Sequence, residues 1–345
     1  MPTFAEESWR IGNLSGQNAF GKKREVNVQM RKRLLTIIIL LCACTGIVRA
    51  QYTTYLSQYF MAKPYFNPAT AGESEDLNIL ALARLGQVGI TRGQVSFLAA
   101  ADMPLSIGKT RHGVGVVVYT ESIGLFFNTH VGAQYAYKHK LFGGVLSGGL
   151  QIGLVNQSFD GTKIIKVESE GFHQDTDPAL PATQVSGMGL DLNVGFYYTH
   201  KRFYAGIGMM HVTQPELQLD ENAYNYIGRA FNLMGGYNIQ LRNPLIELQP
   251  SVFLLSDMQS FHADFTARLE YNKMFNGGIS YRVNESVGVM LGVRLGRFQA
   301  GYAYDYPLTA FSRAISGGHE LCVRYAFKLH KTKTGKNRHK SVRIL

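Results

Sequence analysis

The sequence is short of the features that stabilise exported proteins and that build helical membrane proteins. Cysteine is scarce, with three residues in 345, and two of them, Cys42 and Cys44, lie in an apolar segment near the start. If that segment is removed, Cys322 alone remains and no internal disulfide can form. Charged residues make up 17% of the chain, and the mean hydropathy is −0.06. These values exclude long charged helices and a membrane protein with several helical spans.

The body of the chain also has little net charge, although the formal net charge of the whole is +11. Residues 1–50 and 328–345 together hold 15 of the 35 Lys and Arg residues and 3 of the 24 acids. Residues 51–327 therefore hold 20 basic and 21 acidic residues. Because a nucleic-acid-binding domain has a basic face, we expect no nucleic-acid partner.

The apolar run near the start has the pattern of a secretory signal. Met30 is followed by three basic residues at 31–33 and by an apolar run at 34–41. Residues 48–50 read Val-Arg-Ala, which resembles a cleavage site before Gln51. A cationic start, an apolar centre and a small-residue site are the three parts of a signal peptide.

We therefore predict a signal peptide over 30–50 and interpret 1–29 as a misassigned start or an extension. Two alternatives remain open: an N-terminal anchor helix that is not cut, and a lipoprotein acylated at Cys44. Residues 41–44 form only a weak lipobox, and the apolar stretch continues past the cysteine. This continuation favours ordinary cleavage.

Most of the chain alternates apolar and polar side chains in segments of about ten residues. In 261–272, odd-numbered residues are apolar and even-numbered residues are polar or charged. This period of two predicts strands with one apolar face. A soluble sandwich also alternates, but ten residues is the length that a tilted strand needs to cross a membrane. Aromatic residues also gather at the strand ends, as in membrane barrels, and lipid requires the sheet to close.

The predicted fold is all-β, an antiparallel transmembrane outer-membrane β-barrel of about 14 strands over 77–328. We expect the strands near 77–86, 93–102, 113–121, 126–138, 143–156, 187–198, 203–212, 229–241, 246–256, 261–272, 275–283, 286–295, 298–306 and 318–328.

The lengths of the connections predict how the barrel is oriented. The long connections 157–186, 213–228 and 307–317 all follow odd-numbered strands, and the connections after even-numbered strands are short apart from 103–112. Because bacterial barrels have long external loops and short periplasmic turns, both ends of the barrel are expected in the periplasm. The residues 329–345 then form a basic periplasmic tail.

The sequence predicts no catalytic or metal site. The ten histidines lack metal-ligand spacing, and the acidic pair in 175–177 lacks the rest of a calcium loop. Ser260 and His262 project together from one strand, with Asp264 able to orient the histidine, but no oxyanion donor accompanies them. We therefore expect no cofactor, no metal and no enzymatic activity.

Charged side chains on the polar faces of the last five strands are expected to line the lumen. Two roles are open for them: ion pairs that brace the wall, which the pattern favours, or the wall of a selective channel. The predicted network consists of His262, Asp264, Arg268, Glu270, Arg282, Arg294, Asp305, Glu320 and Arg324.

The segment 51–76 before the first strand has more aromatic residues than a free tail would carry, so it needs a surface to bury against. Asn67 before Pro68 is a good helix cap and Gly72 can end the turn, so one helical turn is expected over 67–72. The segment is interpreted as a plug in the periplasmic mouth or as a docking segment for a periplasmic partner. The candidate docking residues are Tyr59, Tyr65, Phe66, Asn67, Pro68, Ala69 and Gly72.

Short motifs occur along the chain in a distinctive order. They include Ser57-Gln58-Tyr59, Asn67-Pro68-Ala69, Ala101-Asp102-Met103-Pro104-Leu105, Asp177-Pro178-Ala179-Leu180, Gly301-Tyr302-Ala303-Tyr304-Asp305-Tyr306 and Ser316-Gly317-Gly318-His319-Glu320. In their order and spacing, over about 52–328, the chain resembles the PorP/SprF family of the type IX secretion system and gliding motility apparatus of Bacteroidetes. The first 29 residues and the basic tail depart from the family pattern.

The resemblance implies an integral component of the cell outer membrane that supports secretion or surface retention of cargo proteins. The partners it implies are outer-membrane lipids, other type IX secretion components, a periplasmic peptidoglycan-linked protein and a secreted cargo protein. It carries over no catalytic residue. The alternative is a passive porin or small-solute transporter, which the bare barrel would equally support. The aromatic segment distinguishes the two, because a porin has no need of it.

Overall fold

The computed structural model describes residues 55–164, 183–220, 223–309 and 315–329. The predicted signal peptide, the extension before it and the basic tail beyond its first residue lie outside the described residues. The described residues all belong to one compact unit. Within the described ranges, no helix is long and apolar enough to span a membrane.

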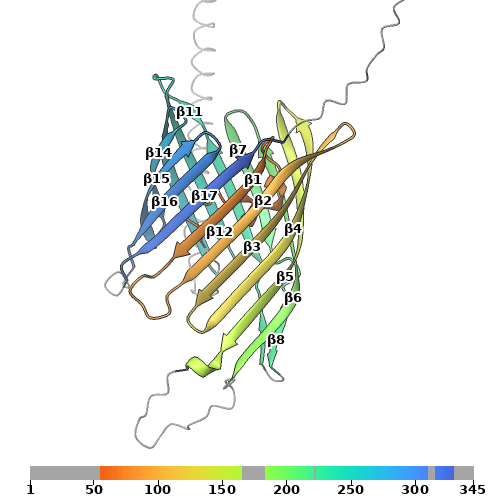
Figure 1. Cartoon of the computed structure of the whole chain (residues 1–345), viewed down its shortest axis with the longest axis vertical. Coiled ribbons are helices and arrows are strands. Elements are labelled where there is room, and N and C mark those ends of the chain that lie inside the picture. The colour runs from red at the N-terminus through yellow and green to blue at the C-terminus, as the bar shows by residue number, and fades with distance from the viewer. Residues whose placement is uncertain (1–54, 165–182, 221–222, 310–314, 330–345) are drawn as a thin grey trace, which may run out of the picture. The chain divides into compact units, whose positions relative to one another are not determined.

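Fourteen antiparallel strands close into a barrel (Figure 1). Around the ring the strands follow the order β10-β7-β6-β5-β4-β3-β2-β1-β17-β16-β15-β14-β13-β12, and the pairing of β10 with β12 closes it. The strands of the ring are β1 (Leu77–Leu85), β2 (Val95–Ile107), β3 (Thr110–Ile123), β4 (Phe126–Leu141), β5 (Gly144–Asp160), β6 (Gln184–Thr199), β7 (Phe203–Met210), β10 (Ala230–Tyr237), β12 (Ile246–Ser256), β13 (Phe261–Tyr271), β14 (Phe275–Arg282), β15 (Ser286–Leu295), β16 (Phe298–Pro307) and β17 (Gly318–Phe327). The predicted fold class and strand number are confirmed.

Four short elements that follow β1 in the chain lie outside this ring count. The two-residue strand β11 (Ile239–Gln240) follows β10 and also pairs with β12. The strands β8 (Glu216–Asp220) and β9 (Ala223–Tyr226) form a separate hairpin in the connection between β7 and β10. A 3-10 turn, η2 (Gly161–Lys163), follows β5.

The side chains of the barrel are arranged inside out relative to a soluble protein. Along β4, Val131 and Tyr135 are exposed, whereas the residues just before them, His130 and Gln134, are buried. Strand alternation sends every second residue to the outer face, and an apolar outer face suits hydrocarbon rather than water. The alternation that predicted the strands therefore also decides which side chains reach the lumen.

The connections differ at the two ends of the barrel, and one predicted exception is wrong. The expected ten-residue loop 103–112 does not exist, because β2 extends to Ile107 and β3 begins at Thr110. Residues expected in that loop belong to the ladder, where Pro104 pairs with Gly113. The real turn is Gly108-Lys109, with Gly108 at a φ of 62°, which glycine adopts easily.

At one end of the barrel, the short-turn end, five of the six connections have two or three residues, and the sixth, 238–245, contains the short strand β11. The connections at the other end, the long-loop end, include 161–183, 211–229 and 308–317. The asymmetry is stronger than the sequence predicts, and short turns are typical of the periplasmic end of bacterial barrels.

Before β1, residues 55–76 run through the lumen. They form one helical turn, α2 (Lys63–Phe66), and one 3-10 turn, η1 (Pro68–Thr70). The Asn67 side chain caps η1 by accepting from the Ala69 amide at 3.0 Å, as its position before a proline predicts. The apolar core of the protein lies where this segment meets the inner wall.

Candidate functional site in the barrel lumen

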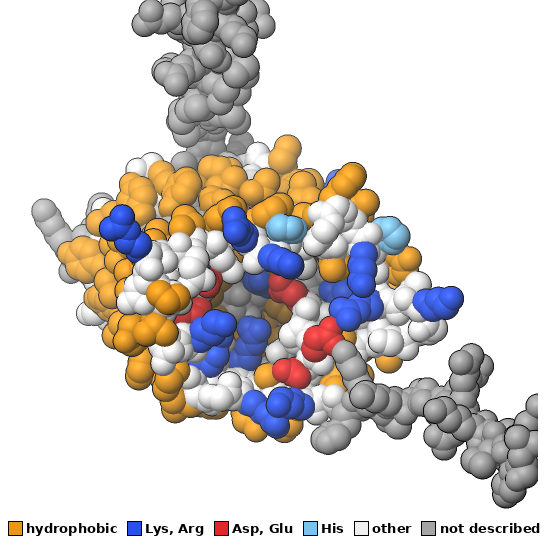
Figure 2. Space-filling model, turned by 90° about the horizontal axis from the view of Figure 1, so that it is seen from above, with side chains coloured by type: hydrophobic (Ala, Val, Ile, Leu, Met, Phe, Trp, Pro, Cys, Tyr) orange, Lys and Arg blue, Asp and Glu red, His pale blue; other side chains and the backbone are white. Residues whose placement is uncertain are grey.

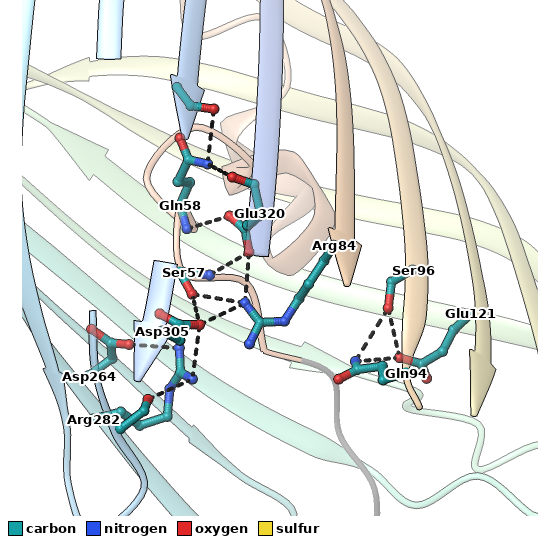
Figure 3. Close-up of polar contacts among 12 residues, drawn as sticks. Ser57, Gln58, Arg84, Gln94, Ser96, Glu121, Asp264, Arg282, Asp305 and Glu320 are labelled. Atoms are coloured by element: carbon teal, nitrogen blue, oxygen red, sulfur yellow. Dashed lines mark hydrogen bonds and ion pairs between the residues drawn. The ribbon is translucent and has the colours of Figure 1, made fainter. Parts of the chain in front are cut away.

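A carboxylate on the barrel wall holds the start of the lumen segment, residues 55–72 (Figure 3). The backbone amides of Ser57 and Gln58 donate to the two oxygens of Glu320, each at 2.8 Å. The Ser57 hydroxyl donates to Asp305 Oδ2 at 2.5 Å. Glu320 and Asp305 lie at lumen-facing positions of the neighbouring strands β17 and β16. Two adjacent strands therefore fix the backbone of the segment by hydrogen bonds to charged groups, which are the stronger kind.

Two arginines join these carboxylates into a buried network. Arg84 Nη1 lies 2.9 Å from Asp305 Oδ2 and 3.1 Å from Glu320 Oε2. Arg282 lies 3.0 Å from Asp264 and 3.9 Å from Asp305. All five side chains are at most 8% exposed. With three carboxylates and two guanidinium groups, the network has one negative charge in excess, and the amides of the lumen segment are placed to stabilise it.

Aromatic side chains of the segment pack against the same wall farther along. The Tyr59 hydroxyl lies 2.8 Å from Ser251 Oγ, and its ring stacks on Phe253 with centroids 4.9 Å apart. The Phe66 ring also packs against Phe253, with centroids 4.6 Å apart. The Tyr65 ring packs against Tyr119 on the inner face of β3, with ring centroids 4.8 Å apart. These rings supply the apolar burial that the sequence requires of this segment.

The turn at Asn67 fits into a wall of glycines. Asn67 Nδ2 donates to the carbonyls of Phe196 at 3.0 Å and Ile207 at 3.1 Å, which lie on β6 and β7. A Cβ added to Gly149 would lie 2.1 Å from the Ala69 amide nitrogen. Glycine is therefore needed where the turn meets β5, because any side chain would overlap the backbone.

All seven candidate docking residues are buried inside the barrel. Docking by these side chains would require the segment to leave the lumen first. The geometry agrees with the other interpretation, in which the segment is a plug.

The plug also differs from the expected segment in its position. Tyr55 contacts His262, which pairs with Glu285, and both of these residues lie at the long-loop end. At the other end of the plug, the Gly72 amide donates to Asp102 Oδ2 at 2.8 Å. The chain thus runs along the lumen from the long-loop end toward the short-turn end, instead of lying wholly in the periplasmic mouth.

The nine charged residues of the predicted lumen network divide into two groups. His262, Asp264, Arg282, Asp305 and Glu320 lie in the long-loop half, and Arg268, Glu270, Arg294 and Arg324 lie in the short-turn half. Arg84, Ser57 and Gln58 also belong to the site and were not among the predicted site residues. Arg84 could have been predicted from the sequence. It lies at an even-numbered position of β1, as Asn78 does, and the even-numbered residues of this strand face the lumen.

The short-turn group lines a cavity of about 220 Å³ at the mouth of the barrel. Figure 2, which views that end, shows Lys, Arg and acidic side chains around a hollow surrounded by apolar side chains. Arg294 lies 3.4 Å from Glu270 and is 43% exposed. Arg268 stacks on Phe60, with its guanidinium carbon 3.5 Å from the ring centroid.

Lys63 and Glu73 form an ion pair of 3.1 Å at this mouth, and the Tyr197 hydroxyl donates to Glu73 at 2.9 Å. Loss of water around Glu73 opposes its charged form. The Lys63 ammonium and the Tyr197 hydrogen bond outweigh that effect and hold the pKa of Glu73 below its ordinary value.

A larger cavity of about 420 Å³ lies at the long-loop end. His130 and His211, which line it, each lie 3.1 Å from the buried Asp191. The sequence gives no signal for this cluster because its members come from β4, β6 and the end of β7.

The acidic pair in 175–177 lies outside the described residues, and the Ser260–His262 pair is not assembled as a catalytic site. In the part of the chain that the structure describes, no group of three or more His, Cys, Asp or Glu side chains could hold a metal ion. The Ser260 hydroxyl donates to Asp257 at 2.8 Å, whereas His262 contacts Tyr55 and Glu285. Ser260 and His262 therefore do not form a nucleophile–base pair.

Comparison with known proteins gives one family and several distant structures. The family described as "Type IX secretion system membrane protein PorP/SprF" matches residues 48–325. None of the curated proteins compared with the chain matches it in sequence.

The similar solved structures are distant. They include the toluene transporter TbuX of Ralstonia pickettii, with 13% identity, 76% of this chain and 92% of that chain covered, and a TM-score of 0.43. The outer membrane protein Omp33 of Acinetobacter baumannii has 7% identity, coverage of 73% and 98%, and a TM-score of 0.44. The translocator domain of the autotransporter NalP of Neisseria meningitidis has 10% identity, coverage of 79% and 96%, and a TM-score of 0.43.

Proposed function

Because the chain belongs to the PorP/SprF family of type IX secretion system membrane proteins and forms an outer-membrane β-barrel, we propose that it supports secretion or surface retention of cargo proteins as a scaffold. The observation that carries the proposal is the plug, which is bound to strands around the whole ring. A passive porin, the alternative, needs a water-filled lumen.

The plug is tied to opposite sides of the barrel. Gln134 on β4 donates to the Pro64 carbonyl at 2.6 Å, and Asn232 on β10 donates to the Phe66 carbonyl at 2.8 Å. Glu320 on β17 and Asp102 on β2 accept from backbone amides of the same segment. The plug could leave the lumen only if all these bonds broke together, so a lumen that opens readily is disfavoured.

Membership of the family implies association with other type IX secretion components. Beyond that, we propose that the apolar outer face contacts outer-membrane lipids. A secreted cargo protein would bind at the long-loop end, and a periplasmic peptidoglycan-linked protein at the short-turn end. Nucleic acid is not proposed as a partner, because residues 51–327 are nearly neutral, and no catalytic role is proposed.

The test separates scaffold from porin. The purified barrel is reconstituted into planar phospholipid bilayers, and its conductance is compared with that of a general porin of similar strand number. We expect little steady conductance from the intact chain. In the native bacterium, deletion of the gene should abolish surface display or secretion of particular cargo proteins. Steady porin-like conductance together with normal cargo export after gene deletion would overturn the proposal.

A milder change tests whether the plug matters for that role. In Glu320→Gln the side chain keeps its size, but it loses its charge and one of its two acceptor oxygens. A buried amide that loses its charged partner costs about 1–3 kcal/mol. We expect higher conductance and reduced cargo export, both measured against Glu247→Gln at the opposite end of the barrel.

A further inference from the structure

We propose that the short-turn mouth is an anion-binding site for an acidic segment of a periplasmic protein, with Arg268, Arg294 and Arg324 at its centre. The inference rests on the proposed function, since it names the chemistry by which the periplasmic partner would be recognised.

The mouth has an excess of positive charge inside the lumen. The cavity of about 220 Å³ is lined by three arginines and Lys63, against two acids, Glu73 and Glu270. A second cavity of about 270 Å³ shares Lys63, Glu73 and Arg324 with the first. The additional acid of the second cavity, Asp102, already accepts from the Gly72 amide.

The arginines have donors to spare. Arg324 makes no side-chain hydrogen bond or ion pair with any other residue that the structure describes. Arg268 Nε is buried and has no hydrogen-bond partner in that part of the chain, although its guanidinium stacks on Phe60. Among the described residues, Arg294 pairs with Glu270 alone, at 3.4 Å. A carboxylate entering the cavity would supply acceptors in the geometry that guanidinium groups bind best.

The rim around this mouth is also basic, and the opposite end is not. The six short-turn connections hold six Lys and Arg residues and no acid. The seven connections at the long-loop end hold five Lys and Arg residues and nine acids. The last strand also ends at Phe327 on the short-turn side. Such a field attracts an acidic partner and orients its approach.

Lipid does not account for the central arginines. Phospholipid headgroups surround the outer face and can reach basic residues of the rim, but Arg268 and Arg324 line cavities inside the barrel. A peptide chain can enter from the periplasm. Two adjoining cavities that share residues suit several carboxylates spaced along one chain better than a single small anion.

The experiment uses the full barrel purified in neutral detergent and a fluorescein-labelled peptide of alternating Glu and Gly residues. Peptides of the same length with Gln or Lys in place of Glu serve as probes of charge, and binding is followed by fluorescence anisotropy. We expect the Glu peptide alone to bind, with an affinity that falls as salt rises. The variant with Arg268→Gln and Arg324→Gln should lose at least about tenfold in affinity, as buried charge pairs do.

The matched control is Arg92→Gln at the long-loop end, where Arg92 donates to the Lys163 carbonyl. It should bind the peptide as the wild type does, and a compact band on unboiled gels checks that each variant folds. If the double variant does not fold, Arg294→Gln alone should weaken binding about threefold, since its partly exposed pair is weak. Unchanged affinity in a folded double or single variant would overturn the proposal.

Three competition results decide the identity of the ligand. Inorganic phosphate or free glutamate that displaces the peptide at millimolar concentration would mean a small-anion site, and anionic phospholipid nanodiscs that displace it would mean a lipid-binding rim. Either result would overturn the peptide proposal, and displacement by neither supports it. Peptide binding does not depend on cargo export, so a failure of the secretion assay would leave this result standing.

Discussion

In the long-loop half of the lumen, Arg84 and Arg282 lie between three carboxylates and are almost fully buried. In the short-turn half, Arg294 is 43% exposed and pairs loosely with Glu270. The residue types and the wall are the same, but the surroundings differ. Buried charges must be paired because water no longer stabilises them, whereas charges at an open mouth remain free to bind something else.

This difference in burial allows one barrel to have a fixed interior in its long-loop half and a binding surface at its short-turn mouth. The buried half holds the plug through Glu320 and Asp305, which accept from Ser57 and Gln58. In the open half the pair of Arg294 with Glu270 contributes little to stability, and the arginines keep unused donors. The two halves differ in how far their charged side chains lie from the open mouth, and not in which residue types they contain.

The largest effect is expected from Arg84→Met. This change leaves Glu320 and Asp305 buried without their shared cation, which costs about 3–5 kcal/mol for a buried pair. The unfolding temperature in detergent should fall strongly and the compact band on unboiled gels should weaken. Arg294→Met is the control at the open mouth, and equal effects of the two changes would contradict the contrast between the two halves.

The next effect concerns the contact between plug and wall. Gly149→Ala would place a Cβ 2.1 Å from the Ala69 amide nitrogen, whereas a Cβ on the adjacent Gly148 would meet only Phe196 at 3.5 Å. Overpacking of this kind costs about 1–3 kcal/mol. Urea unfolding should therefore show a loss for Gly149→Ala and almost none for Gly148→Ala. Equal free energies of unfolding for the two variants would contradict the prediction, because they would mean that the plug can shift to make room for the added methyl group.

These glycines mark where prediction from sequence ends. Alternation predicts every ring strand, because the side of the sheet that a residue faces depends only on its neighbours in the chain. The same rule places Glu320 and Arg282 in the lumen. It cannot tell that Gly149 faces Ala69, since that contact joins residues about eighty positions apart and depends on how deep the plug lies.

The same limit applies to the candidate site. The aromatic residues of 51–76 predict a segment that must be buried, but two burial sites fit, the lumen and a partner. Tyr59 and Phe66 meet Phe253 inside the barrel. Alternation also could not show that Arg268 lies apart from the buried network. It gives the face of the strand on which a charged residue lies, but not its depth along the lumen, which decides which charges are close enough to pair.

A smaller effect is expected from Glu270→Ala. Glu270 accepts from Gln249 at 2.7 Å and pairs with the exposed Arg294, so water replaces much of what is lost. The free energy of unfolding should fall by less than about 1 kcal/mol, as for surface pairs. A loss as large as that of Arg84→Met would show that the open half is as dry as the buried half.

The smallest effect is a dependence on pH at the short-turn mouth. The Lys63 ion pair and the Tyr197 hydrogen bond hold the pKa of Glu73 below its ordinary value of 4.5. A carboxyl whose pKa is lower in the folded chain contributes stability above its unfolded pKa and loses it as the pH falls through the folded value. Because Glu73 is 33% exposed, this contribution should stay below about 1 kcal/mol. The stability of the wild type should therefore exceed that of Glu73→Gln slightly at pH 7, and the difference should vanish below the folded pKa. A difference that persists at pH 2 would mean that the carboxyl acts through its hydrogen bonds alone, and that charge at this mouth does not stabilise the fold.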